Sequence, residues 1–145
     1  MYRRDFVRRL PVVTSGLFLG ASTLSLGACA GIRYVVPRTG PGRLVIAADE
    51  LAVGGEAFVQ TPEMERPVYL RRGASGEVVA LLASCTHNGC QPEPFGDRLV
   101  CPCHGSEFSF EGLVLQGPAE RPLTRYEVSE EGDDLVVRLE RRGAR

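Results

Sequence analysis

The chain has 145 residues, 17 of them basic and 18 acidic, and its formal net charge is −1. Beyond residue 28 there are 13 basic and 17 acidic residues, a formal charge of −4, which does not favour nucleic-acid binding, so we expect no nucleic-acid partner. Removal of residues 1–28 as an export segment would leave 117 residues, which is enough for one compact domain and too few for two full-sized ones.

Residues 1–28 have the features of an export signal or membrane anchor. Residues 3–8, RRDFVR, are similar to the twin-arginine consensus, and a weakly apolar stretch follows over residues 11–28. Twin-arginine export moves folded proteins, which suits a protein whose cofactor is inserted in the cytoplasm. We therefore expect an exported protein on the periplasmic face of a membrane.

The cysteine at position 29 provides a candidate membrane attachment. Residues 26–29, LGAC, resemble the lipobox of bacterial lipoproteins, in which the cysteine receives a diacylglycerol group and becomes the new N-terminus. We therefore expect Cys29 to be lipidated. Two alternatives stay open, namely ordinary cleavage near Ala28 and an uncleaved membrane anchor. A membrane-spanning helix needs roughly 20 predominantly apolar residues, and the glycines in this stretch make it only marginally apolar enough to serve as an anchor.

The remainder of the chain predicts short strands. Residues 29–42 are rich in Pro, Gly and Arg, which is typical of a tether. Apolar residues then alternate with polar ones between Tyr126 and Leu139, which predicts a C-terminal hairpin that turns near Gly132. No segment shows convincing helical periodicity, so the predicted fold class is all-β. Four apolar runs bounded by turn residues predict further strands over residues 43–47, 57–60, 67–71 and 78–83.

Two motifs that combine cysteine with histidine carry the chemistry. They are residues 85–90, CTHNGC, and residues 101–106, CPCHGS, and they contain both histidines of the chain. Two cysteines and two histidines can bind one zinc ion, for which C-x(2 to 4)-C and H-x(3 to 5)-H spacings are typical. Here each pair mixes the two residue types, which favours a binuclear iron–sulfur cluster. A zinc site and a purely structural disulfide cluster are the alternatives.

The two motifs together resemble the Rieske iron–sulfur proteins, in the branch that carries a disulfide between its two cluster loops. The resemblance implies an antiparallel β-sandwich base with an inserted cluster-binding subdomain. The domain would cover residues 43–141 and the subdomain about 84–120. The resemblance also implies one [2Fe-2S] cluster with the ligands Cys85, His87, Cys101 and His104. Cys90 and Cys103 would form the disulfide.

Further roles follow from the same resemblance. The hydroxyl of Ser106 would donate a hydrogen bond to a bridging sulfide, and residues 117–123 resemble the proline loop that covers the cluster. Two positions depart from the quinol-oxidising members of the family, which usually have leucine where this chain has Asn88 and tyrosine where it has Phe108. Phenylalanine cannot donate a hydrogen bond to a ligand sulfur, so we expect a midpoint potential below that of the quinol-oxidising members and above that of the disulfide-free ferredoxin type. Asn88 puts association with a cytochrome b in doubt.

The sequence thus predicts a membrane-tethered one-electron carrier or the small subunit of a periplasmic oxidoreductase, comparable to the small subunit of arsenite oxidase. Its redox partner would be a c-type cytochrome, a molybdenum enzyme or a cytochrome b. We find no catalytic residue outside the motifs, so a stand-alone enzyme is not expected. Two alternatives remain: the quinol-oxidising subunit of a cytochrome bc complex, and a binding module whose cluster is a structural staple or redox sensor.

Overall fold

The structure is a computed structural model that describes residues 31–140. The predicted export segment 1–28 and the predicted lipidation site Cys29 lie outside the described residues. Within residues 31–140 no helix has the length and apolar character needed to cross a membrane.

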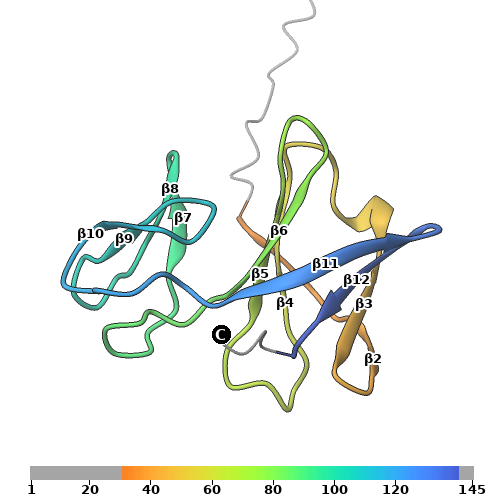
Figure 1. Ribbon diagram of the computed structural model, residues 1–145, viewed down its shortest axis with the longest axis horizontal. Coiled ribbons are helices and arrows are strands. Elements are labelled where there is room, and N and C mark those ends of the chain that lie inside the picture. The colour runs from red at the N-terminus through yellow and green to blue at the C-terminus, as the bar shows by residue number, and fades with distance from the viewer. Residues whose placement is uncertain (1–30, 141–145) are drawn as a thin grey trace, which may run out of the picture. The chain divides into compact units, whose positions relative to one another are not determined.

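Eight strands form one large curled sheet, with the order β1-β4-β5-β6-β11-β12-β3-β2 (Figure 1). Neighbouring strands are antiparallel except for β1 and β4, which are parallel, so the sheet is mixed. A 3-10 turn, η1 (Ala48–Glu50), follows the third strand. The strands are β1 (Arg33–Val35), β2 (Arg38–Gly40), β3 (Arg43–Ala47), β4 (Glu56–Val59), β5 (Val68–Arg72), β6 (Val78–Leu82), β11 (Arg125–Glu131) and β12 (Asp134–Arg138).

Strands were predicted at all four apolar runs, and β3 to β6 confirm them to within one residue. The predicted C-terminal hairpin is also present as β11 and β12. Gly132 lies in its turn with φ +65°, a conformation that glycine adopts without the steric cost that a Cβ would bring. Alternating apolar side chains identified these strands because each has at least one buried face.

The first two strands lie within the segment that the sequence predicted to be a tether. β1 pairs with β4 and β2 pairs with β3, so residues 33–40 belong largely to the large sheet. The ring of Tyr34 packs 5.3 Å from the ring of Phe58, and Arg33 forms an ion pair with Glu50. Each strand has only three residues, which is too short for an apolar alternation to be visible in the sequence.

Four short strands form a separate antiparallel sheet with the order β10-β9-β8-β7. All four lie between β6 and β11 in the chain, and Figure 1 shows this small sheet beside the large one. The predicted all-β fold with an inserted subdomain is therefore confirmed. The strands are β7 (Glu93–Phe95), β8 (Arg98–Val100), β9 (Glu107–Phe108) and β10 (Val114–Gln116).

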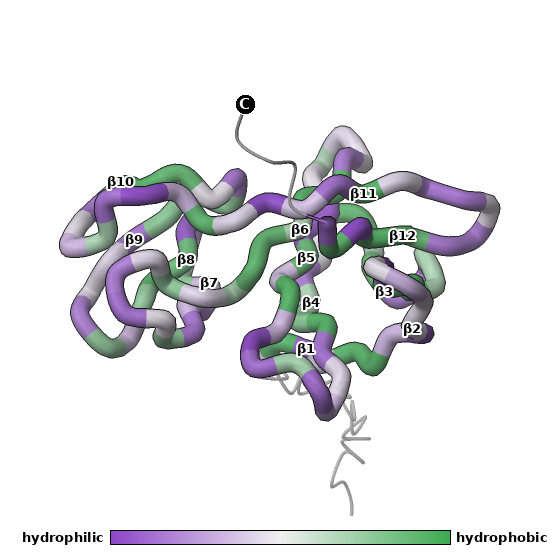
Figure 2. The backbone as a smooth tube through the Cα atoms, turned by 60° about the horizontal axis from the view of Figure 1, so that its bottom comes forward, coloured by the Kyte–Doolittle hydropathy of each residue, from purple (hydrophilic) through white to green (hydrophobic). Residues whose placement is uncertain are grey.

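The central strands β4, β5 and β6 are buried on both faces. On β5, Val68 and Leu70 pack into a core inside the curled sheet, whereas Tyr69 between them packs into a second core beneath the small sheet. Figure 2 shows hydrophobic residues through the middle of the large sheet and hydrophilic residues at the β11–β12 turn. The second core contains Phe58, Tyr69, Val79, Leu81, Ala83, Cys85, Leu99, Cys101, Phe108, Ala119 and Leu123. The base therefore supports two of the motif cysteines directly.

Candidate metal centre

The loop after β6, residues 85–90, is closed by two backbone hydrogen bonds. The amide of Cys85 donates to the carbonyl of Cys90 at 2.8 Å, and the amide of Gly89 donates to the carbonyl of Cys85 at 2.7 Å. Gly89 has φ +73°, in the left-handed region that favours glycine. The loop is therefore a tight turn that begins at a buried cysteine.

The loop after β8, residues 101–106, repeats this plan. The amide of Cys101 donates to the carbonyl of Ser106 at 2.8 Å, and the amide of Gly105 donates to the carbonyl of Cys101 at 3.0 Å. Gly105 also has φ +73°. The backbone hydrogen bonds and the glycines of the two loops thus correspond, and Cys101 is the counterpart of Cys85.

Cys85 and Cys101 are unbonded cysteines with exposed fractions of only 3% and 1%. Burial alone would raise the pKa of the Cys85 thiol. Hydrogen bonds from the His87 amide, the Cys101 thiol and the Ser106 hydroxyl, with a smaller one from the Asn88 amide, outweigh burial and lower that pKa. Cys85 is therefore the sulfur at which negative charge is best stabilised.

The pKa of the Cys101 thiol moves in the opposite direction. Burial raises it, and the hydrogen bond to Cys85 and the charge of that sulfur raise it further. Hydrogen bonds from the backbone amides of Cys103 and His104 lower it but do not outweigh these effects. The two sulfurs therefore lie close together, and a second negative charge beside the first is unfavourable. A cationic metal centre would allow both to ionise, so this donor pair fits one iron of a cluster.

The two histidines form a second pair. The ring centroids of His87 and His104 lie 5.0 Å apart with the planes at 83°, and both residues are exposed. Across residues 31–140, no three Cys, His, Asp or Glu side chains converge closely enough to hold a single ion. The structure instead places the four predicted ligands in two pairs, Cys85 with Cys101 and His87 with His104. This is the arrangement that a two-iron centre with mixed ligands takes.

The predicted disulfide between Cys90 and Cys103 is confirmed. It joins the last residue of the first loop to the third residue of the second loop, and the two cysteines are 13 positions apart in the sequence. The bridge therefore ties the two loops together and leaves Cys85 and Cys101 as the unbonded thiols of residues 31–140.

The segment that resembles a proline loop closes the site from another direction. The amide of Ala119 donates to the Oγ of Ser106 at 3.0 Å, and the Oγ1 of Thr86 donates to the carbonyl of Arg121 at 2.5 Å. Leu123 is buried in the same core as Cys85. The segment includes a cis peptide bond between residues 117 and 118. Sequence reasoning missed the role of Thr86, because its partner lies 35 residues away and nothing in the local sequence indicates the contact.

Phe108 is fully buried beside the two unbonded cysteines. Its ring offers them no hydrogen-bond donor. Tyr69 lies in the same core but donates its hydroxyl to a carboxylate oxygen of Glu56 at 2.7 Å. Burial, followed by this hydrogen bond, raises the pKa of Tyr69, so the phenol keeps its proton and stays committed to Glu56.

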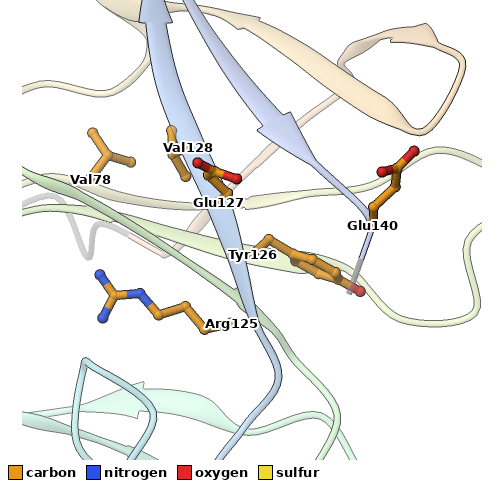
Figure 3. Close-up of a pocket in the computed structure, with 6 residues that line it drawn as sticks. All are labelled: Val78, Arg125, Tyr126, Glu127, Val128 and Glu140. Atoms are coloured by element: carbon orange, nitrogen blue, oxygen red, sulfur yellow. The ribbon is translucent and has the colours of Figure 1, made fainter. Parts of the chain in front are cut away.

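A hollow of about 400 Å³ on the base lies apart from these loops (Figure 3). It is lined by Val78, Arg125, Tyr126, Glu127, Val128 and Glu140. In Figure 3, the lining side chains come from β11, from the start of β6 and from the segment after β12. The hollow contains no motif cysteine or histidine, so it is not part of the candidate metal centre.

Comparisons with known proteins agree with this geometry. Residues 43–127 match the family model of the Rieske [2Fe-2S] domain. The cytochrome b6-f complex iron-sulfur subunit of Chlorobaculum tepidum is 30% identical over 146 residues, which cover 94% of this chain and 75% of that protein. The subunit of the same name from Prochlorococcus marinus is 32% identical over 158 residues, which cover 95% of this chain and 85% of that protein.

Among solved structures, the cyanobacterial plasma membrane Rieske protein PetC3 from Synechocystis PCC 6803 is similar to this chain. The two share 41% sequence identity, and the TM-score is 0.51. The match covers 57% of this chain and 85% of that chain.

Proposed function

Because the chain belongs to the Rieske [2Fe-2S] family, we propose that it is an exported, membrane-tethered one-electron carrier or the small subunit of a periplasmic oxidoreductase. Its general class is that of a Rieske iron–sulfur electron-transfer protein. The observation that carries the proposal is the pair of exposed histidines joined by tight loops to a pair of buried, adjacent thiols.

The proposed ligands consist of a buried cysteine pair and an exposed histidine pair. Cys85 and Cys101 would bind one iron from the core, and His87 and His104 would bind the other at the surface. A bound [2Fe-2S] cluster supplies the one-electron redox chemistry. The loop amides and the Ser106 hydroxyl stabilise negative charge on the sulfurs, and the exposed imidazoles shorten the distance to a partner.

Membrane attachment is proposed through Cys29 or through an uncleaved segment before it. Three residues separate Cys29 from the start of β1 at Arg33, a length of about 10 Å of extended chain. An uncleaved anchor that ends at residue 28 would leave a similarly short link, residues 29–32, before β1. The domain would therefore stay close to the lipid surface, because the large sheet already begins at Arg33, within the predicted tether.

A second candidate is the quinol-oxidising subunit of a cytochrome bc complex, with cytochrome b as partner. The names of the full-length relatives favour it. Asn88 is exposed beside His87, where a polar amide would weaken an apolar contact with a membrane subunit, and Phe108 lacks the hydroxyl expected in that class. We therefore keep the carrier as the leading proposal.

The first test is electron paramagnetic resonance of the purified, dithionite-reduced protein, followed by a redox titration of the same sample. We expect an anisotropic signal whose mean g value lies below that of an all-cysteine cluster, because imidazole ligates one iron. We also expect a midpoint potential below that of quinol-oxidising subunits.

Three outcomes would contradict the proposal at different levels. A colourless protein that contains zinc would show that the site does not hold an iron–sulfur cluster. A midpoint equal to that of quinol-oxidising subunits would favour the second candidate. A normal signal from a protein that exchanges electrons with no protein or small oxidant would favour a structural or sensing cluster.

Replacing Phe108 with tyrosine is expected to raise the midpoint potential. The new hydroxyl would lie in the same core as both ligand sulfurs and could donate to one of them, which stabilises the more negative reduced state. A hydrogen bond to a charged acceptor contributes about 1.5–3 kcal/mol. If the hydrogen bond is about 1.4 kcal/mol stronger in the reduced state than in the oxidised state, the midpoint potential rises by about 60 mV for a one-electron couple. Redox titration of the variant measures it.

Phe110→Tyr provides the matched control for this prediction. The ring of Phe110 stacks on Tyr69 with centroids 6.3 Å apart, and the Arg71 guanidinium lies 3.9 Å from its centroid. The same chemical change there should leave the midpoint unchanged. Equal midpoints for wild type and Phe108→Tyr would show that position 108 does not tune the potential.

A further inference from the structure

A shallow groove lies on the small sheet beside the second cluster loop. It has a volume of about 290 Å³ and is lined by Glu93, Pro94, Phe95, Val100 and Pro102. Four of these five residues are apolar. Phe95, at the end of β7, is 75% exposed, which is unusual for a large aromatic side chain. Aromatic side chains exposed in this way dominate the energetics of many protein interfaces.

The groove adjoins the second cluster loop, which carries His104, because Pro102 of that loop lines it. Pro102 lies between Cys101, a proposed ligand, and Cys103 of the disulfide. His104 follows two residues after Pro102, and residues 102–104 are all exposed. A partner group seated in the groove would therefore lie against the loop that presents His104.

The charge of this region indicates the kind of partner. Residues 84–124 contain five acidic and two arginine side chains, a formal charge of −3. Arg98 is already engaged, with Asp97 at 2.9 Å and Glu107 at 2.7 Å. Glu93 at the groove is exposed and has no ion-pair partner among residues 31–140. The groove thus combines four apolar residues with one exposed carboxylate, on a subdomain whose formal charge is negative.

We propose that this groove is the docking site of a basic one-electron carrier protein. An apolar side chain or exposed cofactor edge of that partner enters the groove, and its lysine or arginine residues face Glu93. One electron leaves this protein and is gained by the oxidised partner, and no bond is made or broken. The assignment rests on the proposed function, since it requires that the centre exchange electrons at the His104 surface.

The test measures the second-order rate at which the reduced holoprotein reduces a basic cytochrome c, by stopped-flow absorbance. Phe95→Ser is expected to lower this rate constant about tenfold, because it removes an apolar anchor worth about 1.4 kcal/mol. Glu93→Gln is expected to lower it about threefold at low ionic strength and to weaken its salt dependence, as loss of a rim charge does. The electron paramagnetic resonance signal and midpoint should match those of wild type.

Matched controls lie on the base. Glu140→Gln removes one negative charge at the hollow of Figure 3, and Val53→Ser removes an apolar side chain that is 63% exposed. Both should keep the wild-type rate. All variants should reduce 1,4-benzoquinone, a neutral small oxidant, at the wild-type rate, because it needs no docking surface.

The outcomes separate the docking site from the proposed function. Wild-type rates with cytochrome c for Phe95→Ser and Glu93→Gln would overturn the docking site. Equal slowing with benzoquinone would also overturn it, because the variants would then have altered the centre itself. Wild-type protein that reduces benzoquinone but not the basic cytochrome would refute a basic partner and leave the carrier function standing. Failure with both oxidants would refute the carrier function.

Discussion

A Cys101→Ser variant is expected to purify without iron, without visible colour and without an electron paramagnetic resonance signal when reduced. Cys101 is almost fully buried, belongs to the second core and lies beside Cys85. A serine hydroxyl stays protonated where a thiol can ionise, and a buried neutral hydroxyl cannot replace a thiolate ligand. The iron content per chain and the spectrum of the reduced protein measure the effect.

The control is the same substitution at Cys29. Its position lies outside the described residues and outside both motifs, so Cys29→Ser should keep two irons per chain while losing any lipid. Retention of two irons and an unchanged signal in Cys101→Ser would remove Cys101 from the ligand set. Because metal binding contributes to folding, we also expect Cys101→Ser to unfold at a lower temperature than Cys29→Ser.

Loss of the Cys90–Cys103 bridge has the second large expected effect. A double Cys90→Ser, Cys103→Ser variant is expected to lose about 3 kcal/mol of unfolding free energy. The bridge closes a loop between cysteines 13 positions apart, and without it the unfolded chain gains conformational freedom. It also links the two loops directly, in addition to their own turns and the contacts of Thr86 and Ser106 with residues 117–123. Urea unfolding of wild type and variant measures the difference.

Reduction of the wild-type disulfide in dithiothreitol provides the chemical control, since it removes the same constraint without a substitution. The reduced wild type and the double variant should then unfold at similar urea concentrations. A double variant as stable as the oxidised wild type would mean that the cluster and the small sheet hold the loops without help. In that case the bridge would have another role.

The sequence predicted the strands whose side chains alternate across a buried face. In the C-terminal hairpin, Leu135 and Val137 are fully buried and belong to the core inside the curled sheet. Their spacing of two is visible in the sequence because burial selects apolar residues at every second position of a strand. The short strands of the small sheet and β1 and β2 have two or three residues each, so no comparable pattern exists.

The chemistry of the site was predictable because its residue types are rare and closely spaced. The chain has two histidines, and both lie within three residues of a cysteine that starts a motif. Short-range spacing of this kind is set by the local turn, which the glycines at positions 89 and 105 allow. The family resemblance then supplied the ligand set and the disulfide.

What the sequence alone determined is therefore the set of chemical groups and the two turns that present them. The tertiary structure decided which groups meet: Cys85 beside Cys101, the Thr86 hydroxyl on the carbonyl of Arg121, and Phe95 exposed next to Pro102. These contacts join segments that come together only when the small sheet folds onto β4, β5 and β6. Residues far apart in a chain contact one another through packing, and the order of residues along the chain does not specify that packing locally.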